Sequence, residues 1–201
     1  MSDIYKTNDM DNSQNVNTAL LVMDAHILHR LDDEKVRDAA TGHLQKAIAT
    51  ARRAGLPVVY VVVTFRQGWP EVNVANKAFG AWKQSGGAPG MEEPARFPPA
   101  LAPQAGDLIV TKRRVSAFTG SDLEVILRSG RIEHLVLTGF ATSGVVLSTL
   151  REAADKDFRV TVLSDGCADR DEEVHTVLLT KVFPRQADVM TVAEWEKTLK
   201  R

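Results

Sequence analysis

The chain has 201 residues, of which 44% are hydrophobic and 25% are charged, and its formal net charge is -1. These values are typical of one globular domain and exclude collagen-like and disordered chains. A net charge this close to zero argues against binding to nucleic acid or to an anionic membrane, so we expect a small-molecule substrate. No apolar run approaches the roughly 20 residues of a membrane span, and no signal peptide is recognisable, so we expect a cytoplasmic protein.

Strands and helices are expected to alternate along the chain. Residues 1–17 are polar and predict a flexible N-terminal arm, which leaves 18–201 as one domain. Short apolar runs predict buried strands, namely Thr18–Asp24, Pro57–Thr64, Asp107–Lys112, His134–Gly139, Arg159–Ser164 and Ala187–Met190. Apolar residues at three- and four-residue spacing predict helices over Val36–Ala51, Gly144–Lys156 and Glu172–Val182. Capping boxes of the S/T-x-x-E type predict two further helix starts, at Ser121 and at Thr191.

This alternation predicts an α/β fold. Strand–helix–strand units with right-handed crossovers give a single-domain, three-layer αβα fold that is Rossmann-like, with a mostly parallel six-stranded sheet between the helices. One long irregular stretch, 65–106, interrupts the pattern and contains a possible short helix near Val74–Lys83. Because so long a connection usually lids a site, Trp69 and Trp82 within it are candidate lid aromatics.

Several enzyme classes are excluded by their missing motifs. The residues after the first strand contain no glycine-rich loop for a dinucleotide, and no P-loop is present, so we expect no cofactor. The serine in Gly139–Gly144 is displaced from the G-x-S-x-G spacing of a serine hydrolase. The histidines lack metalloprotease spacing and the single cysteine, Cys167, offers no zinc knuckle, so we expect no metal. We interpret Cys167 as a buried structural residue.

Three segments together resemble the isochorismatase-like hydrolases, a family that includes nicotinamidases and other cysteine amidohydrolases. The segments are LLVMD ending at Asp24, KRRVSAFTGSDL beginning at Lys112, and TGFATSGVVLSTLREAADKDFRVTVLSD beginning at Thr138. The resemblance covers the chain after Asn17. It implies the isochorismatase-like version of the αβα fold and a hydrolase activity.

The resemblance also implies a catalytic aspartate and lysine, but not the nucleophile of the amidases. Amidase members use an aspartate, a lysine and a cysteine, and the matching residues here are Asp24, Lys112 and Val145. Valine has no lone pair or dissociable proton with which to form an acyl-enzyme. True isochorismatases also lack the cysteine and cleave a vinyl ether with water, their aspartate protonating the enol carbon. A nearby lysine favours the carboxylate of Asp24 and burial favours its neutral form, so the protonation state stays open.

A second feature implied by the resemblance is a cis peptide between Phe140 and Ala141. In the family this peptide helps to aim backbone N–H groups, here those of Ala141 and Val145, into an oxyanion hole. Thr142 belongs to the same motif and is a candidate substrate contact. We expect the hole to bind a carboxylate or carbonyl oxygen without a cysteine side chain.

Four more residues are candidate substrate contacts. His26 stands where the family often has glutamine, and it is either a second acid or base or a helix-capping residue. Arg66 and Arg113 either clamp a substrate carboxylate through bidentate hydrogen bonds or lie on the surface. Phe118 matches an aromatic residue near the family's pocket, although a core position is equally compatible with the sequence.

The leading hypothesis is a hydrolase that acts on a small polar, carboxylated metabolite by Asp24 and Lys112 acid–base chemistry. An alternative is a catalytically altered or inactive family member that binds a metabolite or serves an assembly. A third is catalysis by His26 with water as the nucleophile. Family members commonly form dimers or tetramers, so we expect a homo-oligomer.

Overall fold

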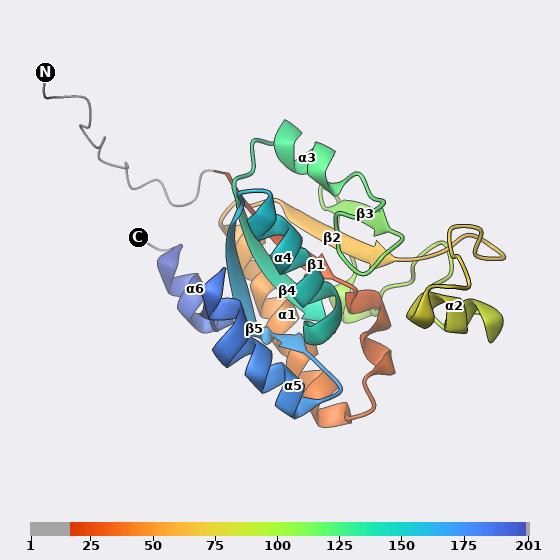
Figure 1. Ribbon diagram of the computed structural model, residues 1–201. Coiled ribbons are helices and arrows are strands. Elements are labelled where there is room, and N and C mark those ends of the chain that lie inside the picture. Colours follow the sequence, from red (N-terminus) through yellow and green to blue (C-terminus); the bar gives the residue numbers. More distant parts are fainter. Residues whose placement is uncertain (1–16, 200–201) are drawn as a thin grey trace, which may run out of the picture.

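A computed structural model describes residues 17–199, so residues 1–16 of the predicted arm lie outside the described part of the chain. The described residues form one sheet of six strands in the order β3-β2-β1-β4-β5-β6. All its neighbouring strands are parallel, which confirms the predicted α/β fold (Figure 1). The strands are β1 (Thr18–Met23), β2 (Val58–Val63), β3 (Leu108–Lys112), β4 (His134–Phe140), β5 (Arg159–Ala168) and β6 (Asp188–Met190).

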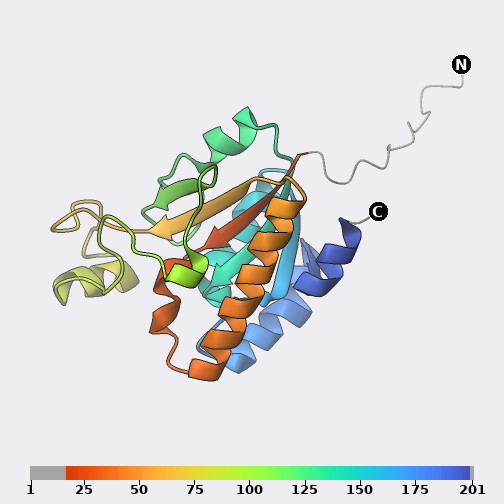
Figure 2. The same cartoon turned by 180° about the vertical axis from the view of Figure 1, so that it is seen from behind.

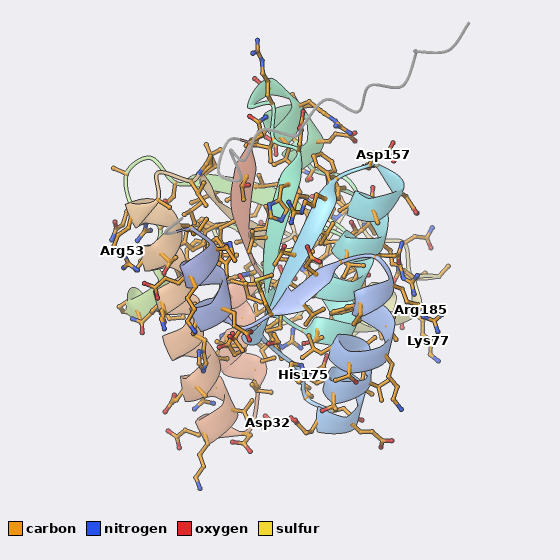
Figure 3. All side chains as sticks on the ribbon, turned by 90° about the vertical axis from the view of Figure 1, so that its left-hand side faces the viewer. Asp32, Arg53, Lys77, Asp157, His175 and Arg185 are labelled. Carbon is orange, nitrogen blue, oxygen red and sulfur yellow. The ribbon has the colours of Figure 1, made fainter. Side chains whose placement is uncertain are left out.

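The central strands are continuous apolar runs because helices cover both of their faces. Every residue of β1 and β2 is buried, as expected for a parallel sheet between two helical layers. On one face lie α1 (Glu34–Arg53) and α6 (Val192–Thr198), and on the other α3 (Leu123–Ser129), α4 (Leu147–Asp155) and α5 (Glu172–Val177). Figure 3 shows these layers, with Arg53 marking α1 on one side and Asp157, just beyond α4, on the other.

The start of α6 agrees with its predicted capping box. The Thr191 hydroxyl accepts a hydrogen bond from the backbone N–H of Glu194, and the Glu194 carboxylate accepts one from the N–H of Thr191. Trp195 in this helix is buried in the core on the α1 side of the sheet. This tryptophan therefore packs within the chain.

The capping box predicted at Ser121 is wrong. Helix α3 begins at Leu123, and the Ser121 hydroxyl donates to the carbonyl of Ala117 at 2.6 Å. The carboxylate of Glu124 accepts a hydrogen bond from Lys156 Nζ at 2.8 Å. The Ser121 oxygen accepts from the N–H of Leu123 at 3.2 Å and not from that of Glu124, and the Glu124 carboxylate binds a lysine instead, so the reciprocal hydrogen bonds of a capping box are not formed.

Two predicted helices contain a π-helical turn. The segment predicted as Gly144–Lys156 consists of a π turn, Thr142–Val146, that runs into α4. The segment predicted as Glu172–Val182 consists of α5 followed by a second π turn, Leu178–Val182. Such turns are often found at functional sites, and the first of them directly follows β4.

The long segment between β2 and β3 forms a separate flap over the carboxyl edge of the sheet. It contains the predicted short helix as α2 (Lys77–Gln84), which lies beyond the arrowhead of β2 and apart from the helical layers (Figures 1 and 2). Lys83 Nζ ties α2 down by donating to the carbonyls of Trp69 and Val72, both at 2.8 Å. Trp69 is buried against Phe65, with ring centroids 4.2 Å apart, so it packs inside the flap.

Candidate active site

A cavity of about 300 Å³ lies at the carboxyl edge of the sheet. Ligands of open α/β folds bind at this edge. Five residues predicted from the sequence line it, and we call them the pocket floor: Asp24, Lys112, Phe140, Ala141 and Val145. Three further residues, Arg30, Trp82 and Arg170, line the same cavity, and we call them the pocket rim.

Asp24 is placed by a sharp turn at the end of β1. Its backbone is left-handed, with φ 54° and ψ 22°, and the chain then enters the 3-10 helix η1 (Ala25–Arg30). This turn brings the carboxylate beside the next strand, where Oδ1 accepts a hydrogen bond of 3.0 Å from the backbone N–H of Val63. A backbone donor therefore fixes the position of Oδ1, and Oδ2 is available to a side chain.

That side chain is Lys112, the last residue of β3. Its Nζ lies 2.9 Å from Asp24 Oδ2, and the two side chains are only 2% and 6% exposed. The ammonium also donates to the carbonyl of Arg114 at 3.0 Å. Burying an ion pair seldom stabilises a fold more than apolar residues do, so a pair in the floor of a cavity points to a function.

The opposite side of the floor is formed where β4 ends. The peptide between Phe140 and Ala141 is cis, as the resemblance implied. Gly139 before it has φ 138°, and a Cβ there would lie 2.1 Å from the carbonyl oxygen of Met23, so β4 can pass β1 this closely only with glycine. Val145 follows in the π turn and is buried. An oxyanion hole at the N–H groups of Ala141 and Val145 stays a prediction.

The rim carries two arginines that the sequence analysis did not select. The Arg170 guanidinium donates from Nη2 to the carbonyl of Arg30 at 3.0 Å. The Arg30 guanidinium lies 5.1 Å from the centre of the Trp82 ring. Neither arginine forms an ion pair with a carboxylate of residues 17–199. Burial, and then the charge of Arg170, lower the pKa of Arg30. The rim therefore carries two cations without an ion pair in this range, and the nearby carboxylate of Asp169, which lines the same cavity, accepts from the backbone N–H groups of Ser143 and Arg170.

A longer fifth strand explains why Arg170 was missed. The predicted strand ended at Ser164, whereas β5 continues to Ala168 after a shift in its register with β4. The residues just beyond the strand are thus Asp169 and Arg170. The predicted strand ended with its apolar run, so these two residues were not recognised as lying at the ligand-binding edge of the sheet.

His26 is near the floor but does not line the cavity of the candidate site. It lines a neighbouring cavity of about 530 Å³, together with His29 and Phe97. The ring is 2% exposed, and its Nε2–H donates to the carbonyl of Val63 at 3.2 Å. Desolvation by burial is the largest influence on this imidazole and lowers its pKa. The structure therefore places His26, a predicted substrate contact, outside the cavity of the candidate site.

Phe118 and Thr142 are also outside the cavity. Phe118 is buried in the core, with its ring 5.9 Å from that of Phe158. The Thr142 hydroxyl is buried, donates to the carbonyl of Ala168 at 3.0 Å and lies 2.8 Å from His175 Nδ1. Their side chains thus stabilise the layers around the site.

The predicted carboxylate clamp of Arg66 and Arg113 is corrected by the structure. Arg66 is bound to Glu71 at 2.5 Å and its side chain is 62% exposed. Arg113 donates to the carbonyl of Thr64 and is bound to Glu93 at 2.5 Å. Each guanidinium is satisfied by acceptors of its own chain, and neither lines the cavity. The arginines that line the cavity are Arg30 and Arg170.

Cys167 is buried beside Gly139 in the sheet, and burial raises the pKa of its thiol to about 12. The predicted burial of Cys167 is confirmed, and a neutral buried thiol is a poor nucleophile. Residues 17–199 contain no group of three or more His, Cys, Asp or Glu side chains arranged to hold a metal ion. Within the same range no helix is long and apolar enough to cross a membrane.

The comparison with protein families agrees with the class defined by the fold and the pocket floor. The model of the isochorismatase domain matches residues 18–194. The chain belongs to the isochorismatase family of hydrolases. The isochorismatase family protein YecD of Escherichia coli O157:H7 is 32% identical over 187 residues, which cover 88% of this chain and 93% of that protein.

Relatives with named activities are amidohydrolases. The ureidoacrylate amidohydrolase of Pseudomonas syringae pv. syringae is 33% identical over 140 residues, 62% of this chain and 56% of the relative, so the match spans little more than half of that enzyme. The N-carbamoylsarcosine amidase of Thermoplasma acidophilum superposes with a TM-score of 0.71 at 27% identity, over 88% of this chain and 96% of the other. A cysteine hydrolase of Pseudomonas syringae pv. phaseolicola shares the fold, with a TM-score of 0.81 at 23% identity over 92% of this chain and 93% of the other.

Proposed function

We propose that this hydrolase cleaves a small carboxylated molecule by acid–base chemistry of Asp24 and Lys112, with water as the nucleophile. The observation that carries the proposal is the buried ion pair of 2.9 Å in the floor of a cavity. At the position of the amidase cysteine, Val145 supplies no nucleophile. The attacking group must therefore come from solvent, and Asp24 is the floor residue able to exchange a proton with it.

Cleavage of an enol ether illustrates the proton balance. Asp24, after its carboxylate has taken up a proton from solvent, gives that proton to the enol carbon, and water adds to the oxocarbenium carbon that results. The water then returns a proton to the Asp24 carboxylate, and the hemiketal collapses to a ketone and an alcohol. The ammonium of Lys112 stabilises the carboxylate between these steps, and the Val63 N–H holds its orientation.

The rim and the flap define the kind of substrate. Arg30 and Arg170 lack a carboxylate partner within residues 17–199 and line the cavity, so they are suited to bind a substrate carboxylate. Phe79, Trp82 and Met91 of the flap form an apolar wall of the same cavity. We therefore propose a substrate with a carboxylate at one end and a small apolar or unsaturated portion beside it.

The test measures pyruvate released from isochorismate and ammonia released from a panel of amides and ureides, the latter chosen from the relatives' named activities. Asp24→Asn removes the titratable group and is expected to lower kcat by about 10²- to 10⁴-fold. Asp188→Asn, at an exposed position of β6, is the matched control. Multiple turnover by Asp24→Asn at the wild-type rate would contradict the proposal.

Val145 favours one alternative, a family member that binds a metabolite or serves an assembly without turnover. That reading predicts saturable binding of isochorismate or of a panel compound, measured by calorimetry, with no product after many equivalents. Multiple turnover of any panel compound refutes it. A buried Asp–Lys pair retained in the pocket floor is the reason to prefer catalysis.

We also propose a cytoplasmic homo-oligomer. A single cysteine that is buried as a free thiol is compatible with a reducing compartment. Leu108 and Ile109, on the edge strand β3, are 41% and 53% exposed and offer an apolar surface to a second copy.

A further inference from the structure

His26 is a buried polar residue that the proposed chemistry does not use. It lies two residues after Asp24, where the left-handed turn leads into η1. Its ring is 2% exposed and does not line the cavity of the candidate site. A buried imidazole at this place needs an explanation other than contact with substrate.

The hydrogen bonds of Asp24 and His26 converge on one residue of the neighbouring strand. Asp24 Oδ1 accepts from the N–H of Val63 at 3.0 Å, and His26 Nε2 donates to the C=O of Val63 at 3.2 Å. The N–H of Asp24 itself donates to the carbonyl of Val61 at 2.8 Å. The turn after β1 is thus attached to the end of β2 at three points, two of them on either side of the Val63 Cα atom.

The ring has one possible tautomer in this arrangement when it is neutral. A carbonyl oxygen only accepts, so Nε2 carries the hydrogen and Nδ1 carries the lone pair. Among the described residues Nδ1 has no hydrogen-bond partner, so the ring is anchored by Nε2 alone. Burial is the largest influence on the pKa of His26 and outweighs the opposing charge of Asp24, so the pKa is lowered and the neutral ring is favoured.

We propose that His26 is a positioning residue: its hydrogen bond to the carbonyl of Val63 holds the end of β2 so that the N–H of Val63 orients the Asp24 carboxylate toward Lys112. Without that anchor Val63 can turn, and Asp24 loses the backbone donor that fixes Oδ1. A displacement of about 1 Å at a reacting group is enough to lower a rate about 100-fold. This inference rests on the proposed catalytic role of Asp24, although the geometry at Val63 is measurable without turnover.

The test uses two substitutions that separate the two ring nitrogens. Glutamine places its amide nitrogen near the position of Nε2, whereas asparagine reaches only the position of Nδ1. His26→Asn is expected to lower kcat by about 10- to 100-fold with KM changed less than about twofold, because His26 does not line the substrate cavity. His26→Gln is expected to keep most of the wild-type kcat. The control is His134→Gln, at the opposite end of β4, where the ring bonds to Thr18 and Thr161.

The second readout is the backbone amide resonance of Val63 in ¹⁵N-labelled protein, which also reports whether each variant is folded. The amide proton is expected to move upfield in His26→Asn and in Asp24→Asn, and to stay near its wild-type position in His26→Gln and His134→Gln. A Val63 amide that does not move in folded His26→Asn overturns the inference, and so does one that moves while kcat stays unchanged. If the wild-type protein turns over neither isochorismate nor any panel compound, the proposed function fails, and the Val63 resonance alone decides whether His26 positions Asp24.

Discussion

The pocket floor and the pocket rim are built in different ways. Floor residues sit at the ends of β1, β3 and β4 or directly after them, and the Asp24–Lys112 pair is closed by backbone partners as well as by its own contact. Rim residues come from η1, α2 and the turn after β5, and Arg30 and Arg170 contact each other without a carboxylate partner in residues 17–199. The sheet thus fixes the groups that we propose for the chemistry, whereas the segments attached to it present the groups that we propose for ligand selection.

The largest expected effect is on the floor, in Lys112→Met. Removing the ammonium leaves the buried Asp24 carboxylate without its cation, which costs about 3–5 kcal/mol of unfolding free energy. Replacing both partners, in Asp24→Asn with Lys112→Met, is expected to recover most of that loss, because no uncompensated charge is then buried. Urea unfolding of the single and double variants measures the difference.

The activity of the same single and double variants is compared as well. Both variants are expected to be inactive, so the double variant combines a stable fold with a lost reaction. A double variant as unstable as Lys112→Met would show that the pair serves the fold, and the contrast between floor and rim would then lose its functional meaning.

A smaller effect is expected on the rim, in Arg30→Gln and Arg170→Gln. A hydrogen bond to a charged group contributes about 1.5–3 kcal/mol, so each variant is expected to raise KM for a carboxylated substrate by roughly 10- to 100-fold and to change kcat little. Steady-state kinetics on the compound that the wild-type protein turns over provides the measurement. The matched control is Arg66→Gln, because that guanidinium is exposed and outside the cavity. Equal losses in the control would indicate a general charge effect.

The pocket floor was also easier to predict from the sequence than the pocket rim. Asp24 and Lys112 were predictable through the family resemblance, and each also ends a short apolar run, so the ends of parallel strands bring them to one edge. Trp82 was selectable only as an aromatic in a long connection, since no periodicity gives the path of the flap. Arg170 was hidden by the polar continuation of β5 beyond Ser164, which only pairing with β4 reveals.

Contacts between side chains explain the other differences. Arg66 and Arg113 looked free in sequence, but Glu71 and Glu93 of the folded flap neutralise them. A sequence shows that charges exist, whereas their pairing depends on loops whose path it does not encode locally. The cis peptide at Phe140 was accessible only through the family resemblance.

The smallest expected effect is on cysteine alkylation, which compares a thiol placed in the pocket floor with the buried thiol of Cys167. At pH 8 the Cys167 thiol, whose pKa is raised to about 12 by burial, is almost wholly protonated, so the native wild-type protein is expected to resist iodoacetamide. Val145→Cys places a second thiol in the cavity near the ammonium of Lys112, which favours the thiolate. Mass spectrometry after a short incubation is expected to show one alkylated site, at position 145. Labelling of Cys167 should become rapid when the protein unfolds. Rapid labelling of native wild-type protein at pH 8 would mean that Cys167 is accessible and reactive in the folded protein. The absence of a cysteine at position 145 would then not be enough to distinguish this protein from a cysteine hydrolase.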